Sequence, residues 1–307
     1  MGFEFELAGI DLEDCAELIA EIFGGEIAYH HSLQAEVESP GYGTFVVELD
    51  ARMVQELAEK LEGAKPTRKG LVSWMGDAAE KIVPFEIVTP PLRLGDFDKL
   101  EQLRRRLQEM KAQGTKAAFV NAFGMHINPE LASEEVDHVR DVLRAFLVLY
   151  PWLVKVMDID FSRRMLTYID PFPTSYLRLA LPADYRPDWG QFITDYLEHN
   201  PNRNRALDLL PLFAHIDESS LNSLKESDRK LVKARPSYHY RLPNSEIDCA
   251  DWTIARDWNR WVEVEKLAGE RDKLERMAAD YLEFLGKPLR IFSSWPKILD
   301  KEHGYRI

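Results

Sequence analysis

Hydrophobic and polar residues alternate at the start of the chain, over Phe3 to Leu7, with the period of two that is typical of a β-strand. One face of this strand carries Phe3, Phe5 and Leu7, and the other carries Glu4 and Glu6. Similar patterns predict further strands at 44–49, 83–89, 117–127 and 237–242.

Apolar residues at helical spacing predict helices between these strands. Asp11 is a candidate N-cap for a helix through Phe23, Asp96 for one to about Ala112, and Ser133 for one that runs into Pro151. Further helical segments are expected at 51–62, 188–198, 204–211 and from Trp252 onward. Helices of unequal length, without a glycine-rich phosphate loop, favour an α+β fold over a doubly wound dinucleotide-binding fold.

The composition narrows the possible partners. A formal net charge of -13 and a sequence pI of about 5.2 argue against nucleic acid, whose phosphates require a dense cationic surface. ATP remains compatible, because a metal ion can lie between carboxylates and phosphates. The longest apolar run is interrupted by Pro151 and Lys155, and no signal-like segment is present, so we expect a cytoplasmic protein that does not span a membrane.

Several residues on the predicted strands are candidates for metal binding. Glu4 and Glu6 lie about 6.5 to 7 Å apart on one strand face, which suits a pair of Mg²⁺ or Mn²⁺ ions bridged by phosphates. An exposed strand face explains this pair equally simply. Glu86 interrupts an apolar strand, where a carboxylate normally needs a partner. His126 is either a ligand or a satisfied core histidine, and Asp50 is either a ligand or a helix cap.

Several motifs together resemble the amidoligase family, a branch of the glutamine synthetase and glutamate-cysteine ligase superfamily. These are FEFE near the start, EIVTPPL at 86–92, FGMHINP at 123–129 and HYRLPN at 239–244. The resemblance continues through DPFP at 170–173, DYLEHNPNRNRALDLLPLF at 195–213 and WNRWVEVEKLA at 258–268. It implies a single glutamine synthetase-like catalytic domain over 1–307, with a mainly antiparallel curved sheet flanked by helices and a mostly helical insert at about 160–232.

The resemblance also implies roles for individual residues. It makes Glu86, His126 and Arg241 the catalytic residues, with Arg241 and His126 contacting nucleotide phosphate. Metal ligands are implied at Glu4, Glu6, Asp50, Glu86, His126 and His239, with Asp77 as an alternative to Asp50. His239 stands where relatives commonly carry a metal-binding Glu, and Asn128 where many carry a second histidine.

Three further arginines are candidate phosphate or carboxylate contacts, because a guanidinium suits bidentate anion recognition. They are Arg235, Arg203 and Arg205. A surface position explains Arg235 equally well, and turn chemistry is an alternative for the segment at 201–205.

The implied activity is an ATP-dependent carboxylate-amine ligase with Mg²⁺, or Mn²⁺, as cofactor and an acyl phosphate as intermediate. Its substrates would be small-molecule or peptide carboxylates and amines. A phosphotransferase on the same scaffold and a non-catalytic nucleotide-binding relative are the alternatives. The sequence leaves open the acid, the amine and the oligomeric state.

Overall fold

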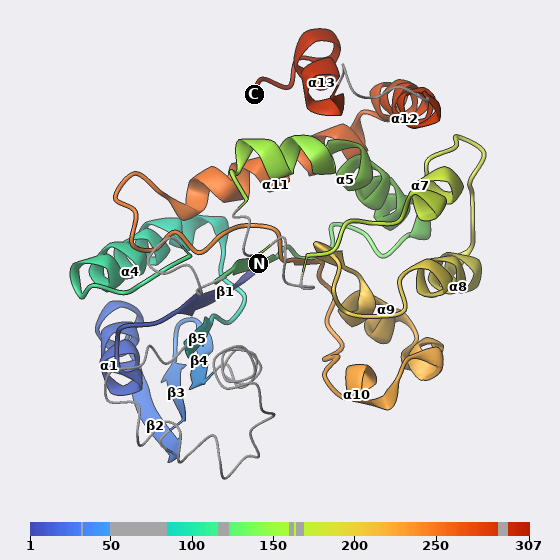
Figure 1. The fold of residues 1–307 in the computed structure, drawn as a ribbon. Helices are drawn as coiled ribbons and strands as arrows, with labels where there is room; N and C mark the ends of the chain where they lie inside the picture. The colour runs from blue at the N-terminus through green and yellow to red at the C-terminus, as the bar shows by residue number, and fades with distance from the viewer. Residues whose placement is uncertain (32, 50–84, 116–122, 160–162, 164–168, 288–293) are drawn as a thin grey trace, which may run out of the picture. The chain divides into compact units, whose positions relative to one another are not determined.

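The structure is a computed structural model that describes residues 1–31, 33–49, 85–115, 123–159, 163, 169–287 and 294–307 (Figure 1). The chain divides into two compact units. Unit 1 comprises Met1–Ile127 and Pro243–Ala255, and unit 2 comprises Asn128–Leu242 and Arg256–Ile307. Both units contain strands and helices, which confirms the predicted α+β class.

Unit 1 is built on an open sheet. Its strands are β1 (Gly2–Leu7), β2 (Glu26–His31), β3 (Gln34–Ser39), β4 (Gly43–Leu49), β5 (Phe85–Val88) and β6 (Met125–Asn128), whose last residue belongs to unit 2. They lie in the order β2-β3-β4-β5-β1-β6, and the pairs from β2 to β1 are antiparallel. The predicted strands at 3–7 and 44–49 are therefore confirmed, whereas β2 and β3 were not predicted.

The two faces of this sheet differ in polarity, as the alternation along β1 predicts. The apolar face is buried beneath α1 (Leu12–Phe23) and α4 (Phe97–Glu109), the latter preceded by the short 3-10 helix η1 (Leu94–Asp96). The ring centroids of Phe23 and Phe45 are 4.5 Å apart, and those of Phe3 and Phe97 are 5.7 Å apart. This packing fixes the register of β1, because a slip by one residue would move its glutamates into the apolar core beneath α1 and α4.

The helix α1 has the predicted boundaries, and α4 begins where predicted but ends at Glu109 rather than at about Ala112. The caps differ from the prediction. Asp11 and Asp96 occupy the N-cap positions of α1 and α4, yet neither side chain accepts a hydrogen bond from its helix. Asp96 instead accepts one from the backbone N–H of Arg93 at 2.9 Å. The predicted helix at 51–62 lies outside the described residues.

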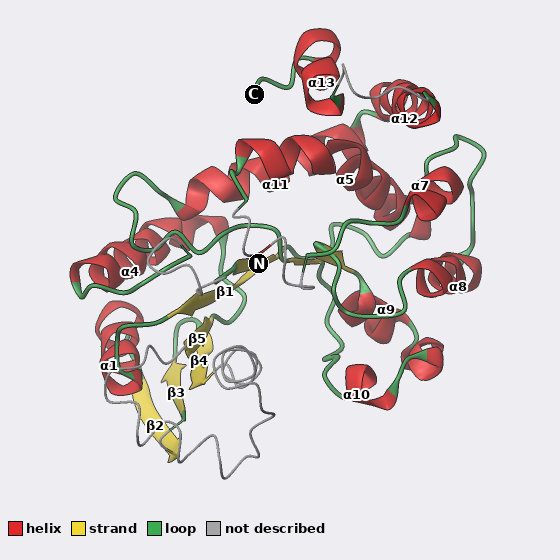
Figure 2. Ribbon diagram, viewed as in Figure 1, coloured by secondary structure: helices red, strands yellow, loops and turns green. Residues whose placement is uncertain are grey.

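Helices make up most of the described part of unit 2 (Figure 2). They are α5 (Val136–Val156), α7 (Thr174–Ala180), α8 (Trp189–His199), α9 (Leu210–Ile216), η2 (Glu218–Ser223), α10 (Glu226–Arg229), most of α11 (Ile254–Gly269), α12 (Arg271–Gly286) and α13 (Trp295–His303). The short strands β7 (Leu207–Asp208) and β8 (His239–Tyr240) form an antiparallel pair. The predicted helix at 188–198 is confirmed as α8, which Asp188 caps by accepting from the N–H of Gln191 at 2.9 Å.

Three predicted elements of unit 2 had wrong boundaries. The helix predicted from Ser133 to Pro151 begins later, with Glu135 in the N-cap position, and continues through Pro151 to Val156. It does not stop at the proline because Trp152 and Leu153 are buried and their packing outweighs the lost backbone hydrogen bond. The segment 204–211 is not one helix, since it holds β7 and only the first two residues of α9. The strand predicted at 237–242 is only two residues long.

The core of unit 2 is aromatic around β8. The ring of Tyr240 lies 5.8 Å from that of Phe146 and 5.3 Å from that of Trp261, between centroids. With Tyr240 directed into this core, its neighbours His239 and Arg241 are directed to the opposite face of the strand. Among the described residues, none of the helices combines the length and the apolar character that crossing a bilayer requires.

Candidate functional site

Glu4 and Glu6 lie on the polar face of the unit 1 sheet, as the alternation in β1 predicts. They are nevertheless buried, with only 8% and 5% of their surfaces exposed. Two buried carboxylates require compensating partners, so an exposed strand face does not explain this pair.

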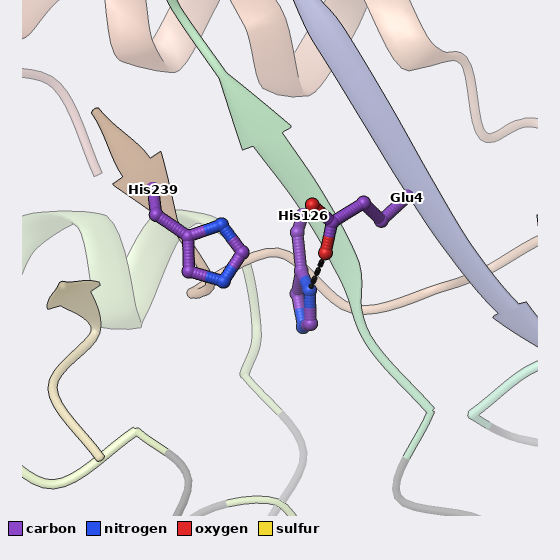
Figure 3. Close-up of side chains that lie close together, drawn as sticks. All are labelled: Glu4, His126 and His239. Atoms are coloured by element: carbon purple, nitrogen blue, oxygen red, sulfur yellow. Dashed lines mark hydrogen bonds and ion pairs between the residues drawn. The ribbon is translucent and has the colours of Figure 1, made fainter. Parts of the chain in front are cut away.

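His126, on β6, lies between these two carboxylates. Its Nδ1 is 2.9 Å from Oε2 of Glu4, and its Nε2 is 3.5 Å from Oε1 of Glu6. The other oxygen of Glu6, Oε2, accepts a hydrogen bond of 2.6 Å from the backbone N–H of Gly124. Figure 3 shows the contact between Glu4 and His126.

The contact with Glu4 identifies the donor on the His126 ring. A carboxylate only accepts hydrogen bonds, so Nδ1 carries the proton that it donates to Glu4. The other ring nitrogen, Nε2, faces Oε1 of Glu6. Their separation of 3.5 Å is close to the distance of about 3 Å between neighbouring ligands of an octahedral ion. The donor set of Glu4, Glu6 and His126 therefore fits a divalent cation such as Mg²⁺ or Mn²⁺.

A row of carboxylates extends from Glu6 across the sheet. Glu6 pairs directly with Glu86 of β5, and Glu86 pairs in turn with Glu48 of β4. Both Glu86 and Glu48 are half-buried. Like charges directly opposite one another destabilise a sheet, so this arrangement has a cost that a bound cation would remove.

Glu48 is the residue of this row that was not among the predicted site residues. The alternation of Phe45 and Val47 with Glu48 indicates that Glu48 lies on the polar face of its strand. That it lies opposite Glu86 follows only from the register of β4 and β5. Asp50 and Asp77, the two alternative acidic ligands, lie outside the described residues.

In unit 2, His239 is held by two neighbours. Its Nδ1 lies 2.6 Å from Oδ1 of Asn128 and 3.3 Å from Nη2 of Arg235. The shorter contact identifies Nδ1–H as a donor to the amide oxygen of Asn128, which leaves Nε2 as the ring nitrogen available to a ligand. An outer partner that fixes the ring in this way is typical of metal-binding histidines. Asn128 thus orients His239, and the guanidinium of Arg235 lies beside the ring.

Arg241 forms a buried ion pair with Asp208 in the same unit. Its Nη2 donates to Oδ2 of Asp208 at 3.0 Å, and the residues are 2% and 0% exposed. The Nε of Arg203 lies 4.0 Å from the same oxygen, Oδ2. Burial, with a further contribution from the charge of Asp208, raises the pKa of the nearby Tyr196, so its phenol remains protonated and donates to the carbonyl of Leu207 at 3.3 Å.

Arg205 differs from the other predicted anion contacts in how its donors are used. Its Nε donates to Oδ1 of Asn200 at 2.8 Å, and its Nη1 donates to the carbonyl of Pro171 at 2.9 Å. Its Nη2 is 3.4 Å from the carbonyl of His199, and the guanidinium lies over the ring of Phe172. These contacts tie the end of α8 to the segment after Asp170, so they give Arg205 a structural function.

Comparison with known protein families gives one match, to a family described as "Putative amidoligase enzyme", over residues 1–263. The matched region includes every residue of the candidate site. No curated protein and no solved structure matches the chain.

Proposed function

Because the chain belongs to the amidoligase family, we propose that it is an ATP-dependent ligase that joins a carboxylate to an amine, with Mg²⁺ as its cofactor. The observation that carries this proposal is the buried group of Glu4, Glu6 and His126, whose distances suit a divalent cation. A ligase that uses ATP requires such a cation to accompany the nucleotide phosphates. Mn²⁺ is the alternative ion, since the group includes an imidazole.

The proposed metal ligands are Glu4, Glu6, Glu86 and His126, with Asp50 and His239 assigned the same role from the family resemblance. Bound there, the cation would neutralise part of the phosphate charge and orient the nucleotide. The row of carboxylates supports this assignment, because a cation beside it would reduce the repulsion between adjacent like charges.

Arg241, Arg235 and Arg203 are the proposed phosphate contacts. In the first step, an oxygen of the substrate carboxylate attacks the γ-phosphorus of ATP, the bond to ADP breaks, and an acyl phosphate forms. The guanidinium of Arg241 stabilises the charge on the transferring group. In the second step, an amine attacks the acyl carbon, inorganic phosphate leaves, and the amine nitrogen loses a proton. Excluding water is essential, because water would hydrolyse the acyl phosphate.

The experiment that tests this function is a screen of amino acids and polyamines, each with a carboxylic acid, for amine-dependent release of ADP. Mass spectrometry then identifies the product. An amide together with free phosphate supports the ligase. A phosphorylated acceptor instead identifies a phosphotransferase, and turnover without ATP identifies a hydrolase.

The replacement of a carboxylate by His239 favours one alternative, a relative that binds nucleotide without turnover. Titration calorimetry with MgATP separates the two cases. Binding of MgATP with no ADP formed in any acid and amine pair would reject the ligase and support the non-catalytic relative.

A further inference from the structure

A cluster of charged side chains lies on one face of the short strand pair in unit 2. Asp208 of β7 is the direct cross-strand partner of His239 on β8. Arg241 follows two residues later, so it lies on the same side of the strand as His239. The backbone N–H of Arg241 donates to the carbonyl of Ala206 at 2.9 Å, which continues the pairing beyond β8.

The carboxylate of Asp208 is fixed at both oxygens. Its Oδ1 accepts a hydrogen bond of 3.0 Å from the backbone N–H of Leu210, in the first turn of α9. Its Oδ2 accepts from Nη2 of Arg241 at 3.0 Å. Because Asp208 is fully buried, it has no solvent-facing alternative to these partners. The position of its carboxylate is thus set by the backbone.

Arg241 is held from two sides. Its side chain is bound by Asp208, and its backbone carbonyl accepts a hydrogen bond of 2.8 Å from Nη2 of Arg163. Its Nε is buried and has no hydrogen-bond partner in the described part of the chain. A buried N–H without an acceptor is costly, so this donor indicates an acceptor other than the residues that the structure describes.

The neighbouring guanidinium groups indicate the nature of that acceptor. Two guanidinium groups, those of Arg241 and Arg203, lie near the carboxylate of Asp208. The Nε of Arg203 is 4.0 Å from Oδ2 of Asp208, the same oxygen that Arg241 binds. Planar guanidinium groups are suited to the oxygens of phosphates and carboxylates, so an oxyanion is the acceptor that best fits the buried Nε of Arg241.

We propose that Asp208 is a positioning residue that fixes the guanidinium of Arg241 and thereby prepares an oxyanion site within unit 2. The ligand is an oxyanion group, from either a phosphate or a carboxylate. The inference rests on the proposed function only for its turnover measurement, because binding of an oxyanion is measurable without any reaction.

Replacement of Asp208 by asparagine separates positioning from simple charge. Asn offers one side-chain acceptor, so it cannot serve both Leu210 N–H and Arg241 Nη2. If Asp208 acted only through its charge, removing that charge would strengthen anion binding. Positioning has the opposite consequence, because a displaced guanidinium binds the anion less well despite the more positive surroundings.

The test uses titration calorimetry of the full chain with inorganic pyrophosphate and, separately, with acetate. Wild type should bind at least one of these probes, and the preferred probe identifies phosphate or carboxylate as the source. Asp208→Asn should weaken that binding about 10-fold or more and lower kcat about 10- to 100-fold with a smaller change in KM. Equal or tighter binding in Asp208→Asn, or no binding of either probe to wild type, would overturn the proposal.

Two further variants keep the result interpretable. Asp195→Asn changes another buried carboxylate of unit 2, which accepts from Tyr185 at 2.8 Å and Gln191 at 2.6 Å, and should leave probe affinity unchanged. Arg241→Lys keeps the charge but loses the planar fork, and should weaken binding as Asp208→Asn does. It serves as the second variant if Asp208→Asn fails to fold, and wild-type affinity in Arg241→Lys would overturn the proposal. Pyrophosphate binding without any amine-dependent ADP release would reject the ligase function while leaving this site intact.

Discussion

Glu6 and Glu86 are direct cross-strand partners in the antiparallel pair of β1 and β5. Their carboxylates are attached to neighbouring strands on the same face of the sheet, and Glu48 continues the row on β4. If the proposed cation binds at this row, its binding stabilises unit 1. Removal of one carboxylate from the row is therefore predicted to affect stability with opposite sign in the absence and in the presence of the metal.

Glu86→Gln should stabilise the metal-free protein and weaken its response to Mg²⁺. Removing the middle charge relieves repulsion worth about 0.2–1 kcal/mol per pair, so the Tm in EDTA should rise. Mg²⁺ should then raise the Tm less than it does in wild type, because binding to the native state is what stabilises it. Thermal unfolding with and without Mg²⁺ measures both effects. A lower Tm in EDTA combined with an unchanged Mg²⁺ response would contradict the assignment of Glu86.

Glu48→Gln should raise the Mg²⁺ concentration required for half-maximal ADP release, by about 10-fold for the loss of one carboxylate near the ion. Glu38→Gln is the matched control, because Glu38 is an exposed glutamate of the same sheet and pairs with Glu26 and Thr44 outside the row. Equal Mg²⁺ requirements in the two variants would remove Glu48 from the site.

His126→Asn should weaken Mn²⁺ binding about 10- to 100-fold, since it removes the imidazole that lies between Glu4 and Glu6. Electron paramagnetic resonance of free Mn²⁺ measures this affinity independently of turnover. His30→Gln is a suitable control, because His30 forms an exposed pair with Glu36 at 3.2 Å in the same unit. If both variants bind Mn²⁺ like wild type, His126 is a structural histidine.

The two cysteines should differ sharply in reactivity. Burial, with contributions from Asp14 and Asp11, raises the pKa of the Cys15 thiol to about 12, so almost no thiolate is present at pH 8. Cys249 is half-buried. Titration with a disulfide reagent should therefore count one thiol in the native protein and two after denaturation. Two thiols reacting in the native protein would show that α1 is not packed as described.

Trp295→Ala should destabilise unit 2 by about 3–5 kcal/mol, as expected for a large core side chain. The indole is 2% exposed, stacks on Tyr281 at 4.6 Å and donates to the carbonyl of Val148 in α5 at 2.8 Å. Denaturant unfolding measures the change, with Leu231→Ala as the control because Leu231 is 56% exposed. A loss below 1 kcal/mol would mean that the packing of α13 on α5 contributes little to the stability of unit 2. The helix α13 lies beyond the region that matches the family.

The sequence was sufficient for elements whose periodicity is strong and local. The alternation in β1 and the apolar spacing in α1 and α4 predicted those elements because each depends on one buried face. The strand β3 was missed, since its inner face carries the small residues Ala35 and Val37 and gives a weak signal. The helix predicted at 204–211 was misplaced, since α9 begins only at Leu210 and Pro211 lies in its first turn, where proline is tolerated.

The sequence predicted which residues belong to the candidate site, but not which of them contact one another. Glu4, Glu6 and His126 were named from strand faces and family resemblance, and their mutual contacts depend on the pairing of β1 with β6. The contacts of Asp208 with Arg241 and of Glu48 with Glu86 depend on strand register, which no local pattern encodes. Local packing is likewise the reason why α5 continues through Pro151.

The alternation along β1 has a consequence for how this protein can change during evolution. Phe3, Phe5 and Leu7 hold the strand against the core, and the same spacing presents Glu4 and Glu6 to the opposite side. Individual side chains on either face can be exchanged one at a time. A single inserted or deleted codon within residues 3–7 would invert the remaining residues and remove both the core contacts and the carboxylates, so the length of this segment should be more constrained than its composition.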